Sequence, residues 1–411
     1  MSAIDETPAS VQDQPLHTTS SPFPRDAGAI VLGGDYQGLG IARSLGRHGV
    51  PVCVVDDERS ITRLSRYCSS HERIADMGDE ERVVDDLLRI ARRRGLEGWV
   101  LYPTRDETVA AIARNRERLG EVFRVPTAPW DAVRWAWDKR NTALIAEEVD
   151  VPAPRSWQPA DAAAIDQIDS EPPWAIKPAI KEHFFYATGA KAWRADSRAE
   201  LRVLLERAWA IAGQGEMIVQ DLIPGDGRQQ YGYCALYSNG RPLATMVVRR
   251  RRQHPPDFGR ASTFVETIDE PEVEALSERV LGRIAYDGLV ELEYKRDPRD
   301  GSFKLLDFNA RTWGYHSIAP AAGVDFPYLL FQHALGERVE PQRARAGVRW
   351  VRLLTDLPTG FVQIRAGDFG VREYLRTLRS AHVEAVFSRE DPLPGLAELA
   401  LLPYLAVKRG F

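Results

Sequence analysis

Apolar and polar positions in the first third of the chain alternate between strand-like runs and helix-like spacing. Residues 29–32 are all apolar and a glycine-rich stretch follows them, which predicts a buried strand, a tight turn and a helix. A second apolar run at 50–56 completes a β-α-β unit. The same alternation predicts a helix at 81–94, a strand at 98–104 and a helix at 107–119. We therefore expect one α/β layer that ends near residue 125.

The middle of the chain follows an α+β pattern. A helix is expected from Trp130 to Glu148, and the prolines that follow it stop it, because proline disfavours helix at the preceding residue. Asn239-Gly240 lies between two alternating runs and predicts a tight β-hairpin. The other expected elements are strands at 174–179, 190–194 and 217–221, a loop at 180–189, a helix at 197–212 and the hairpin strands 232–237 and 241–249.

The segment from Glu291 to Arg311 predicts a hairpin that displays oxygen ligands. Glu291 and Glu293 precede the turn, and Asp307 and Asn309 follow it. Side chains two apart on a strand share a face, so each strand offers two oxygen donors. Arg311 continues the polar stripe and is placed to share the negative charge of a phosphoryl group.

The register of this hairpin decides how close its acids come. If Arg299-Asp300-Gly301 is a three-residue loop with glycine in the left-handed conformation, Glu293 stands opposite Asp307. Two carboxylates about 5 Å apart across a sheet repel unless a cation or shared proton compensates them, and magnesium with bound phosphate is the natural compensator. A solvated hairpin is the commoner meaning of a Glu-x-Glu strand. Leu305, Leu306 and Phe308 argue against it here, because they bury one side of the second strand.

Composition excludes several classes of protein. The 411 residues are 44% hydrophobic and 27% charged, which is ordinary for a globular chain of two or three domains. A formal charge of −5 gives no basic field for nucleic acid, and three scattered cysteines make neither a disulfide scaffold nor a thiolate metal site. No apolar run approaches the roughly 18 residues of a membrane span. We therefore expect a cytoplasmic protein with no nucleic-acid or membrane partner.

The hairpin resembles the carboxyl-terminal signature of the ATP-grasp superfamily, in which an acid precedes a hairpin and an acid-x-Asn-x-Arg run follows it. The resemblance implies that Glu293, Asp307 and Asn309 hold magnesium, with manganese as an alternative, beside the phosphates of ATP. It also implies that Arg311 contacts the transferred phosphate or acyl phosphate. Asp307 and Ala310 depart from the glutamate and proline that many relatives carry at these positions.

Two lysines stand in the order that the superfamily shows. ATP carries about four negative charges, so its site needs cations on several elements. Lys139 opens a helix, and Lys177 lies between apolar residues on a strand, where an unpaired ammonium is costly to desolvate. A solvated location is the commoner alternative for either lysine alone. The resemblance implies that both contact ATP phosphates and that Lys177 also takes part in catalysis.

Further cofactor contacts follow from the same resemblance. They are Lys191 for phosphate, Gln220, Asp221 and Leu222 for the hinge beside adenine, and Asp226 for ribose. Alternation puts Arg249 and Arg251 on one strand face and Arg250 and Arg252 on the other. We assign Arg249 and Arg251 to the nucleotide site, with a solvated edge strand as the alternative.

The resemblance also implies an architecture and a subgroup. The fold class would be α/β and α+β, with an N-terminal Rossmann-like pre-ATP-grasp domain at 27–128, a two-lobed ATP-grasp domain at 129–340 and a C-terminal extension at 341–411 that packs on it. Residues 1–26 have few apolar groups, and their composition predicts a disordered tail. The segment after the arginines resembles a carboxylate-amine ligase subgroup close to D-aspartate ligases. The partners would be small-molecule carboxylates and amines, such as an amino acid or short peptide; a homodimer stays open.

The main hypothesis is an ATP-dependent ligase that joins a carboxylate to an amine through an acyl phosphate. One alternative is a dinucleotide-dependent oxidoreductase that uses the glycine turn, with Asp56 or Asp57 on a ribose, although the strict Gly-x-Gly-x-x-Gly spacing is missing. Another is a nucleotide-binding homologue without catalysis. His316 is either a substrate contact or an ordinary polar residue at a helix start.

Overall fold

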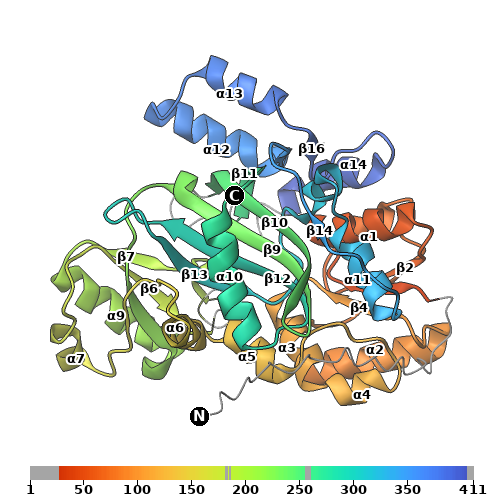
Figure 1. Cartoon of the computed structure of the whole chain (residues 1–411), viewed down its shortest axis with the longest axis horizontal. Coiled ribbons are helices and arrows are strands. Elements are labelled where there is room, and N and C mark those ends of the chain that lie inside the picture. The colour runs from red at the N-terminus through yellow and green to blue at the C-terminus, as the bar shows by residue number, and fades with distance from the viewer. Residues whose placement is uncertain (1–26, 181–183, 185–186, 255–260, 405–411) are drawn as a thin grey trace, which may run out of the picture.

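The computed structural model describes residues 27–180, 184, 187–254 and 261–404. Within these residues the chain forms three β-sheets with helices packed around them (Figure 1). The expected N-terminal tail at 1–26 and residues 181–183 and 185–186 of the expected loop at 180–189 lie outside the described residues. Among the described residues no helix is long and apolar enough to cross a lipid bilayer.

The first sheet is parallel, with strand order β3-β2-β1-β4 in the described chain. Its strands are β1 (Ala29–Leu32), β2 (Val52–Asp56), β3 (Ser70–Arg73) and β4 (Val100–Pro103), and its helices are α1 (Tyr36–Arg47), α2 (Glu80–Arg94), α3 (Asp106–Arg114) and α4 (Arg116–Gly120). Alternate strand residues pack on opposite sides: Val31 lies in one core with Leu39 of α1, and Ile30 in another with Leu87 of α2. The β-α-β start is confirmed.

Two helices that the sequence predicts as continuous are each broken once. Asn115 ends α3, and its side chain donates to the carbonyl oxygen of Ala111 at 3.0 Å, so α4 starts anew. Asp138 separates α5 (Trp130–Trp137) from α6 (Lys139–Glu148). Its backbone is extended and its carboxylate accepts the amide proton of Arg140 at 2.9 Å, which makes it the N-cap of α6. The break puts Lys139 at the first position of a helix.

The second sheet has the order β5-β8-β6-β7 and antiparallel pairs in the described residues. It comprises β5 (Ser156–Trp157), β6 (Trp174–Pro178), β7 (Trp193–Ala195) and β8 (Met217–Asp221), with helices α7 (Ala162–Asp166) and α9 (Arg198–Ala212). Ser197 caps α9 by accepting from the amide of Glu200. A separate apolar core around Trp174, Leu201 and Val219 holds this layer together.

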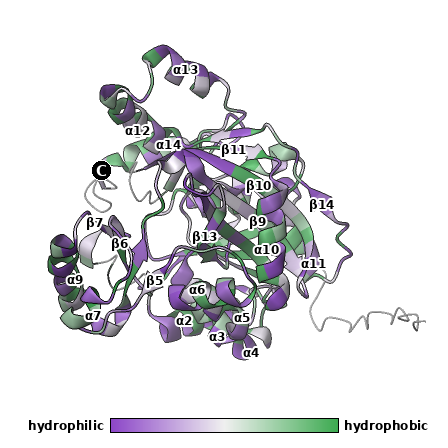
Figure 2. Cartoon of the chain, turned by 60° about the vertical axis from the view of Figure 1, so that its left-hand side comes forward, coloured by the Kyte–Doolittle hydropathy of each residue, from purple (hydrophilic) through white to green (hydrophobic). Residues whose placement is uncertain are grey.

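The third and largest sheet lies at the centre of the molecule (Figure 1) and has the order β13-β12-β9-β10-β11-β15-β16, with β14 beside β10, in the described part of the chain. Its strands are β9 (Gln230–Ser238), β10 (Arg241–His254), β11 (Ala261–Ile268), β12 (Gly288–Arg296), β13 (Phe303–Asn309), β14 (Gln342–Arg343), β15 (Arg349–Val351) and β16 (Val383–Glu384). The associated helices are α10 (Pro271–Arg283), α11 (Phe326–Ala334), α12 (Leu353–Ala366), α13 (Val371–Arg379) and α14 (Leu393–Ala400). The central sheet carries both hydrophobic and hydrophilic segments, and β10 is hydrophilic over its arginine run (Figure 2). The predicted Asn239-Gly240 hairpin is present between β9 and β10.

The C-terminal residues join two layers. Strands β14 to β16 extend the central sheet, as the pairs of β10 with β14 and of β11 with β15 show. The same segment reaches the first sheet, where Asp391 binds Arg43 of α1 at 3.0 Å and accepts from the hydroxyl of Ser65 at 2.7 Å. Both side chains of the Arg43 pair are buried, so this contact ties the end of the described chain to its beginning.

Candidate active site

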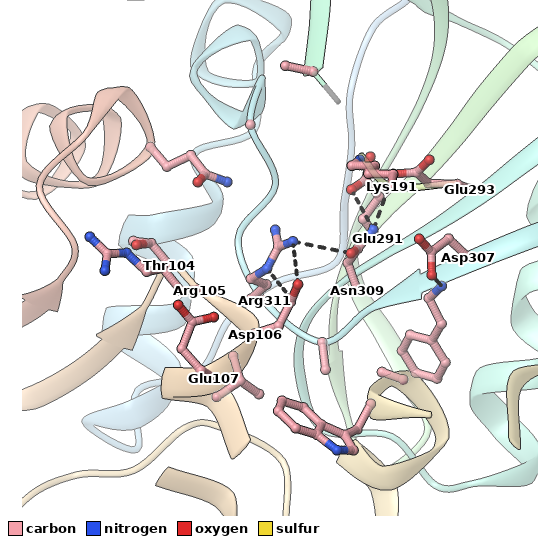
Figure 3. A pocket seen from close by; sticks show the side chains of 18 of the residues that line it. Thr104, Arg105, Asp106, Glu107, Lys191, Glu291, Glu293, Asp307, Asn309 and Arg311 are labelled. Carbon is pink, nitrogen blue, oxygen red and sulfur yellow. Dashed lines mark hydrogen bonds and ion pairs between the residues drawn. The ribbon is translucent and has the colours of Figure 1, made fainter. Parts of the chain in front are cut away.

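A cavity of about 350 Å³ opens where the first sheet, the central sheet and the helices α5 and α6 meet (Figure 3). Ligand sites of this kind usually occupy 300–1,000 Å³. The charged residues that line it are Arg105, Asp106, Glu107, Lys139, Lys191, Arg250, Glu291, Glu293, Asp307 and Arg311. Acidic and basic side chains from both halves of the molecule therefore face one space.

The hairpin β12–β13 carries the acids in the predicted register. Glu293 lies opposite Asp307, and Glu291 lies opposite Asn309. The route to that register differs from the prediction. Hydrogen bonds close the turn around residues 298–301, where Gly301 has φ 76°, and a bulge in β13 then supplies the one-residue shift. The expected three-residue loop is therefore wrong, although the facing pair is right.

Asn309 links the two glutamates of β12. Its side-chain amide donates to Glu291 at 3.1 Å and to Glu293 at 3.2 Å. The hydroxyl of Tyr315 also donates to Glu291. The amide and the hydroxyl thus hold both carboxylates on the cavity side of the strand.

Side-chain cations compensate these acids in the structure. Arg250 of β10 places Nη2 2.6 Å from Glu293 and 3.7 Å from Glu291. Lys139 at the start of α6 binds Asp307. Throughout the described residues no three His, Cys, Asp or Glu side chains are grouped to hold a metal ion. Arg250 and Lys139 supply the positive charge that the sequence analysis assigned to a metal.

Burial and these ion pairs separate the pKa values of the acids. Burial and the neighbouring charge of Glu293 raise the pKa of Glu291 to about 7. Burial is the largest single influence on the pKa of Glu293 and acts to raise it, but the neighbouring cations, chiefly Arg250, together hold the pKa below its ordinary value. Burial acts in the same way on Asp307, and neighbouring lysines, chiefly Lys139, together hold its pKa below the ordinary value. Glu293 and Asp307 are therefore charged at neutral pH.

The lysines approach the hairpin from the other side of the cavity. Lys139 and Lys191 line it, and Lys177 of β6 lies beside the lining residue Pro178. Burial, and then the charge of Lys139, lower the pKa of Lys177 to about 7. The structure thus brings Lys139, Lys177 and Lys191 towards Asp307, where their charges act together.

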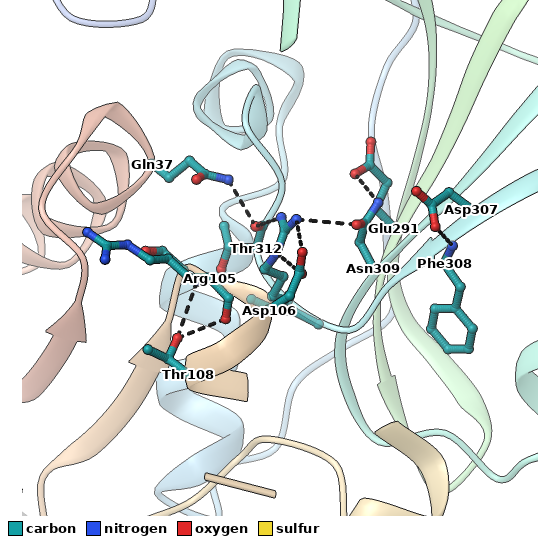
Figure 4. Close-up of polar contacts among 12 residues, drawn as sticks. Gln37, Arg105, Asp106, Thr108, Glu291, Asp307, Phe308, Asn309 and Thr312 are labelled. Carbon is teal, nitrogen blue, oxygen red and sulfur yellow. Dashed lines mark hydrogen bonds and ion pairs between the residues drawn. The ribbon is translucent and has the colours of Figure 1, made fainter. Parts of the chain in front are cut away.

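Arg311 connects the hairpin to the first sheet. Its guanidinium binds the carboxylate of Asp106 at the start of α3, with Nη2 3.3 Å from Oδ2, and lies 3.3 Å from the side-chain oxygen of Asn309 (Figures 3 and 4). The neighbouring Thr312 accepts from the side chain of Gln37 in α1 at 3.4 Å (Figure 4). Asp106 and Gln37 have no sequence signal that would single them out.

Arg249 and Arg251 do not lie with the acids. Arg249 donates to the carbonyl oxygen of Arg228 at 2.8 Å, and Arg251 binds Glu266 at 2.9 Å. Strand alternation was the right principle, but it turns Arg250 towards the cavity. The assignment of Arg249 and Arg251 to the nucleotide stays a prediction, and Arg250 on the other strand face lines the cavity.

The candidates for the adenine and ribose contacts also lie apart from the cavity lining that the structure describes. Gln220 donates to the hydroxyl of Ser156 at 2.9 Å, and the amide of Leu222 donates to Pro173 at 3.1 Å. Asp226 accepts from the amide of Arg228 at 2.8 Å. Gln220 and Asp221 end strand β8, with Leu222 directly after it, so their assignment to the nucleotide stays a prediction.

Protein side chains fill the space beside the glycine turn after β1. The amide of Gly34 donates to Asp56 at 2.7 Å, and Arg105 binds both Asp56 and Asp57 at 2.8 Å. A Cβ at Gly34 would come within 1.9 Å of the Ser60 hydroxyl. The aspartates that the oxidoreductase alternative places on a ribose are thus engaged with the protein.

His316 begins a short 3-10 turn, η4 (His316–Ile318), and is buried. Its Nε2 lies 2.9 Å from the carbonyl oxygen of Gln37. A Cβ at Gly40 of α1 would come within 2.6 Å of its ring. The residue therefore packs the loop after β13 against α1.

Three comparisons connect the chain with known proteins. Residues 217–355 match the family described as "ATP-grasp in the biosynthetic pathway with Ter operon". A D-aspartate ligase from Enterococcus faecium is 24% identical over 297 residues, which cover 69% of this chain and 70% of the ligase.

Solved structures share the fold. The L-amino acid ligase from Bacillus licheniformis has a TM-score of 0.59 and 18% identity, covering 76% of this chain and 75% of the ligase. N5-carboxyaminoimidazole synthetase from Staphylococcus aureus, solved with ADP, has a TM-score of 0.60 and 13% identity, covering 79% and 80%. The biotin carboxylase domain of the Hydrogenobacter thermophilus 2-oxoglutarate carboxylase, solved with MgADP, has a TM-score of 0.62 and 16% identity, covering 78% and 73%. The expected mixed α/β fold class is confirmed: residues 217–355 match an ATP-grasp family, and the chain is similar to a D-aspartate ligase and shares its fold with an L-amino acid ligase.

Proposed function

We propose that the protein is an ADP-forming ligase that joins a carboxylate to an amine through an acyl phosphate. The observation that carries the proposal is the pair Glu293 and Asp307, which face each other across two strands of one cavity wall. Two charged carboxylates in such a position are unfavourable without cations. The site supplies cations from three separate elements, which suits a highly charged ligand such as a triphosphate.

The donor set fits magnesium. Glu293, Asp307 and the side-chain oxygen of Asn309 are all hard oxygen ligands on adjacent strands. Magnesium bound there would neutralise phosphate charge while ATP reacts. Arg250 and Lys139 now occupy the carboxylates, so nucleotide binding requires an exchange of partners. The incoming phosphates provide that exchange, because they offer Lys139 a new anion.

Three lysines and one arginine bind the reacting phosphates in this reaction. Lys139, Lys177 and Lys191 hold the phosphates in line with the acid. A carboxylate oxygen of the substrate attacks the γ-phosphorus and ADP leaves, which gives an acyl phosphate. Arg311 stabilises the charge on the transferred phosphoryl group. The amine then attacks the acyl carbon, inorganic phosphate leaves, and the amine nitrogen loses a proton to solvent or to the departing phosphate.

The substrates belong to the class that the relatives' names indicate. One relative is a D-aspartate ligase and another an L-amino acid ligase, so an amino acid is the first choice for one of the two substrates. A short peptide or a second amino acid is the first choice for the other. Acidic and basic side chains both line the cavity, which suits a zwitterion.

The test is an ADP-release assay with ATP, magnesium and pairs drawn from D- and L-amino acids and simple amines. We expect one or more pairs to release ADP and phosphate in equal amounts. Glu293→Gln should lose this activity, whereas Asp300→Asn at the exposed tip of the same hairpin should retain it. Activity of Glu293→Gln at the normal rate would contradict the metal assignment. Nucleotide binding without turnover for any pair would favour a non-catalytic homologue.

A further inference from the structure

The helices α12 and α13 form a hairpin at one end of the molecule, where both views show them side by side (Figures 1 and 2). Residues 367–370 join them. The helices touch where Tyr374 meets Gly360, since a Cβ on this glycine would come within 2.4 Å of the Tyr374 ring. A short connection of this kind gives an antiparallel pair.

The side of α12 that faces the protein is polar. Thr355, Asp356 and Thr359 are buried. Asp356 binds Arg252 of β10 at 2.8 Å and accepts from the hydroxyl of Tyr374 at 3.0 Å. A helix on a water-exposed surface normally buries its apolar side. This helix has the reverse arrangement.

The outward side of the hairpin is apolar. Leu357 and Phe361 on α12 are 52% and 69% exposed, and Val371 and Leu375 on α13 are 55% and 43% exposed. Leu357 and Phe361 lie three residues before and one residue after Gly360, the contact residue of α12. Val371 and Leu375 have the same offsets from Tyr374, the contact residue of α13. Equal offsets in an antiparallel pair point to the same side, so the four residues form one apolar face.

Arginines border this apolar face. Arg365 follows the exposed pair of α12, and Arg372, Arg376 and Arg379 recur at helical spacing on α13. Among the described residues none of these arginines forms an ion pair. The hairpin also carries the acids Asp368 and Glu373, so the four arginines leave it with a net positive charge beside an uncovered apolar face, in a chain whose net charge is −5.

We propose that the hairpin of α12 and α13 docks on an anionic lipid surface. Leu357, Phe361, Val371 and Leu375 would enter the boundary between headgroups and acyl chains, and the arginines would bind lipid phosphates. This contact lies on the membrane and needs no spanning helix. The proposal departs from the expectation that the protein has no membrane partner, which stays a prediction. A second copy of the chain fits less well, because a two-fold contact brings two positive borders together.

The test is co-sedimentation of the whole chain with vesicles of phosphatidylcholine alone or mixed with phosphatidylglycerol. We expect binding to the mixed vesicles, weakened by salt. Phe361→Ser combined with Leu375→Ser should lower the affinity by about tenfold or more. Arg372→Gln combined with Arg376→Gln should also lower it by about tenfold or more. The matched control is Val203→Ser on α9, an apolar residue that is 66% exposed elsewhere and should leave binding unchanged.

Three outcomes would overturn the proposal. One is failure of the parent protein to bind either kind of vesicle. Another is equal binding to neutral and anionic vesicles, with no effect of the arginine substitutions. The third is a dimer, seen by sedimentation equilibrium, that Phe361→Ser dissociates, which would make the face an interface between copies. Circular dichroism and thermal unfolding of each variant separate loss of the face from loss of the fold.

Discussion

Asp106 and Arg311 are 205 residues apart in sequence and form an ion pair at the edge of the hairpin acids. Asp106 is the first residue of α3, so this carboxylate comes from the first sheet, whereas Arg311 directly follows the polar stripe of β13. The exposed fractions of the two side chains are 23% and 13%. The pair therefore fixes the guanidinium plane from a different layer of the molecule.

We predict that Asp106→Asn lowers kcat of the proposed reaction by about 10- to 100-fold, because a misplaced catalytic group costs rate more than binding. KM for ATP should change by less than about threefold. Steady-state kinetics with the best substrate pair provides the measurement. Asp106→Glu should recover part of the rate, since a longer carboxylate can still reach Arg311.

Glu80→Gln is the matched control for Asp106→Asn. Glu80 binds Arg114 at 2.8 Å in an exposed pair at the start of α2, so its loss should leave both kinetic constants unchanged. An Asp106→Asn variant with normal kcat and reduced stability would show that the pair holds the layers together and has no role in positioning Arg311.

Arg250 gives a direct test of the metal site. Its side chain is 8% exposed and pairs with Glu293, which is 18% exposed. Arg250→Met leaves buried carboxylates without their cation, and we expect it to cost about 3–5 kcal/mol of unfolding free energy. Magnesium should return part of this loss, because it replaces the missing charge. Urea unfolding with and without magnesium measures both effects.

Arg251→Met is the control next to it in the same strand. Its side chain is 39% exposed and binds Glu266, so the substitution should cost about 1 kcal/mol or less and show no response to magnesium. If magnesium stabilises neither variant, or both equally, the hairpin acids are not metal ligands.

The contrast between these two arginines shows what the sequence could predict. Alternation predicts that one arginine pair faces the hairpin, and local patterning predicts that Glu293 faces Asp307. Which arginine face turns inward depends on the pairing of β10 with β9 and β11, a long-range property. The sequence does not point to Asp106 for a similar reason, because its partner Arg311 lies in another layer of the fold.

The helix boundaries show the same limit at short range. Asp138 stands inside an apolar-periodic segment that predicts one helix. A cap and a helix-interior aspartate have the same local sequence, and the packing of α5 and α6 decides between them. The hairpin bulge also has no local signal, because only the hydrogen bonds around the turn reveal it.

The close contact at Gly40 predicts that a side chain at this position would disturb the packing between α1 and the loop after β13. An added Cβ would lie 2.6 Å from the ring of His316, and both residues are buried. Gly40→Ala should therefore destabilise the protein by about 1–3 kcal/mol, although alanine favours a helix over glycine. Gly120→Ala at the end of α4 is the control, because nothing lies within 4 Å of its added Cβ. If Gly40→Ala leaves the midpoint of thermal unfolding unchanged, α1 and His316 can move apart at little cost in free energy.

The lowered pKa of Lys177 predicts how the unfolding free energy depends on pH. Its pKa of about 7 in the folded protein lies below the ordinary value of 10.5, mainly because burial disfavours the charged form. Above about pH 7 the unfolded lysine therefore holds a proton that the folded one has lost, and the unfolding free energy rises with pH. Between about pH 6.5 and pH 9 this contribution should reach roughly 2–3 kcal/mol. Urea unfolding at the two pH values measures it.

Lys177→Met should remove this rise, because methionine does not titrate, and it should stabilise the nucleotide-free protein most at the acidic end. Lys304→Met is the control: Lys304 pairs with Asp300 at the tip of the hairpin, and its loss should leave the pH dependence unchanged. If the parent and Lys177→Met show the same slope with pH, Lys177 stays protonated in the folded protein. In that case an anion or the hairpin acids already compensate its charge, and it would gain less from binding phosphate.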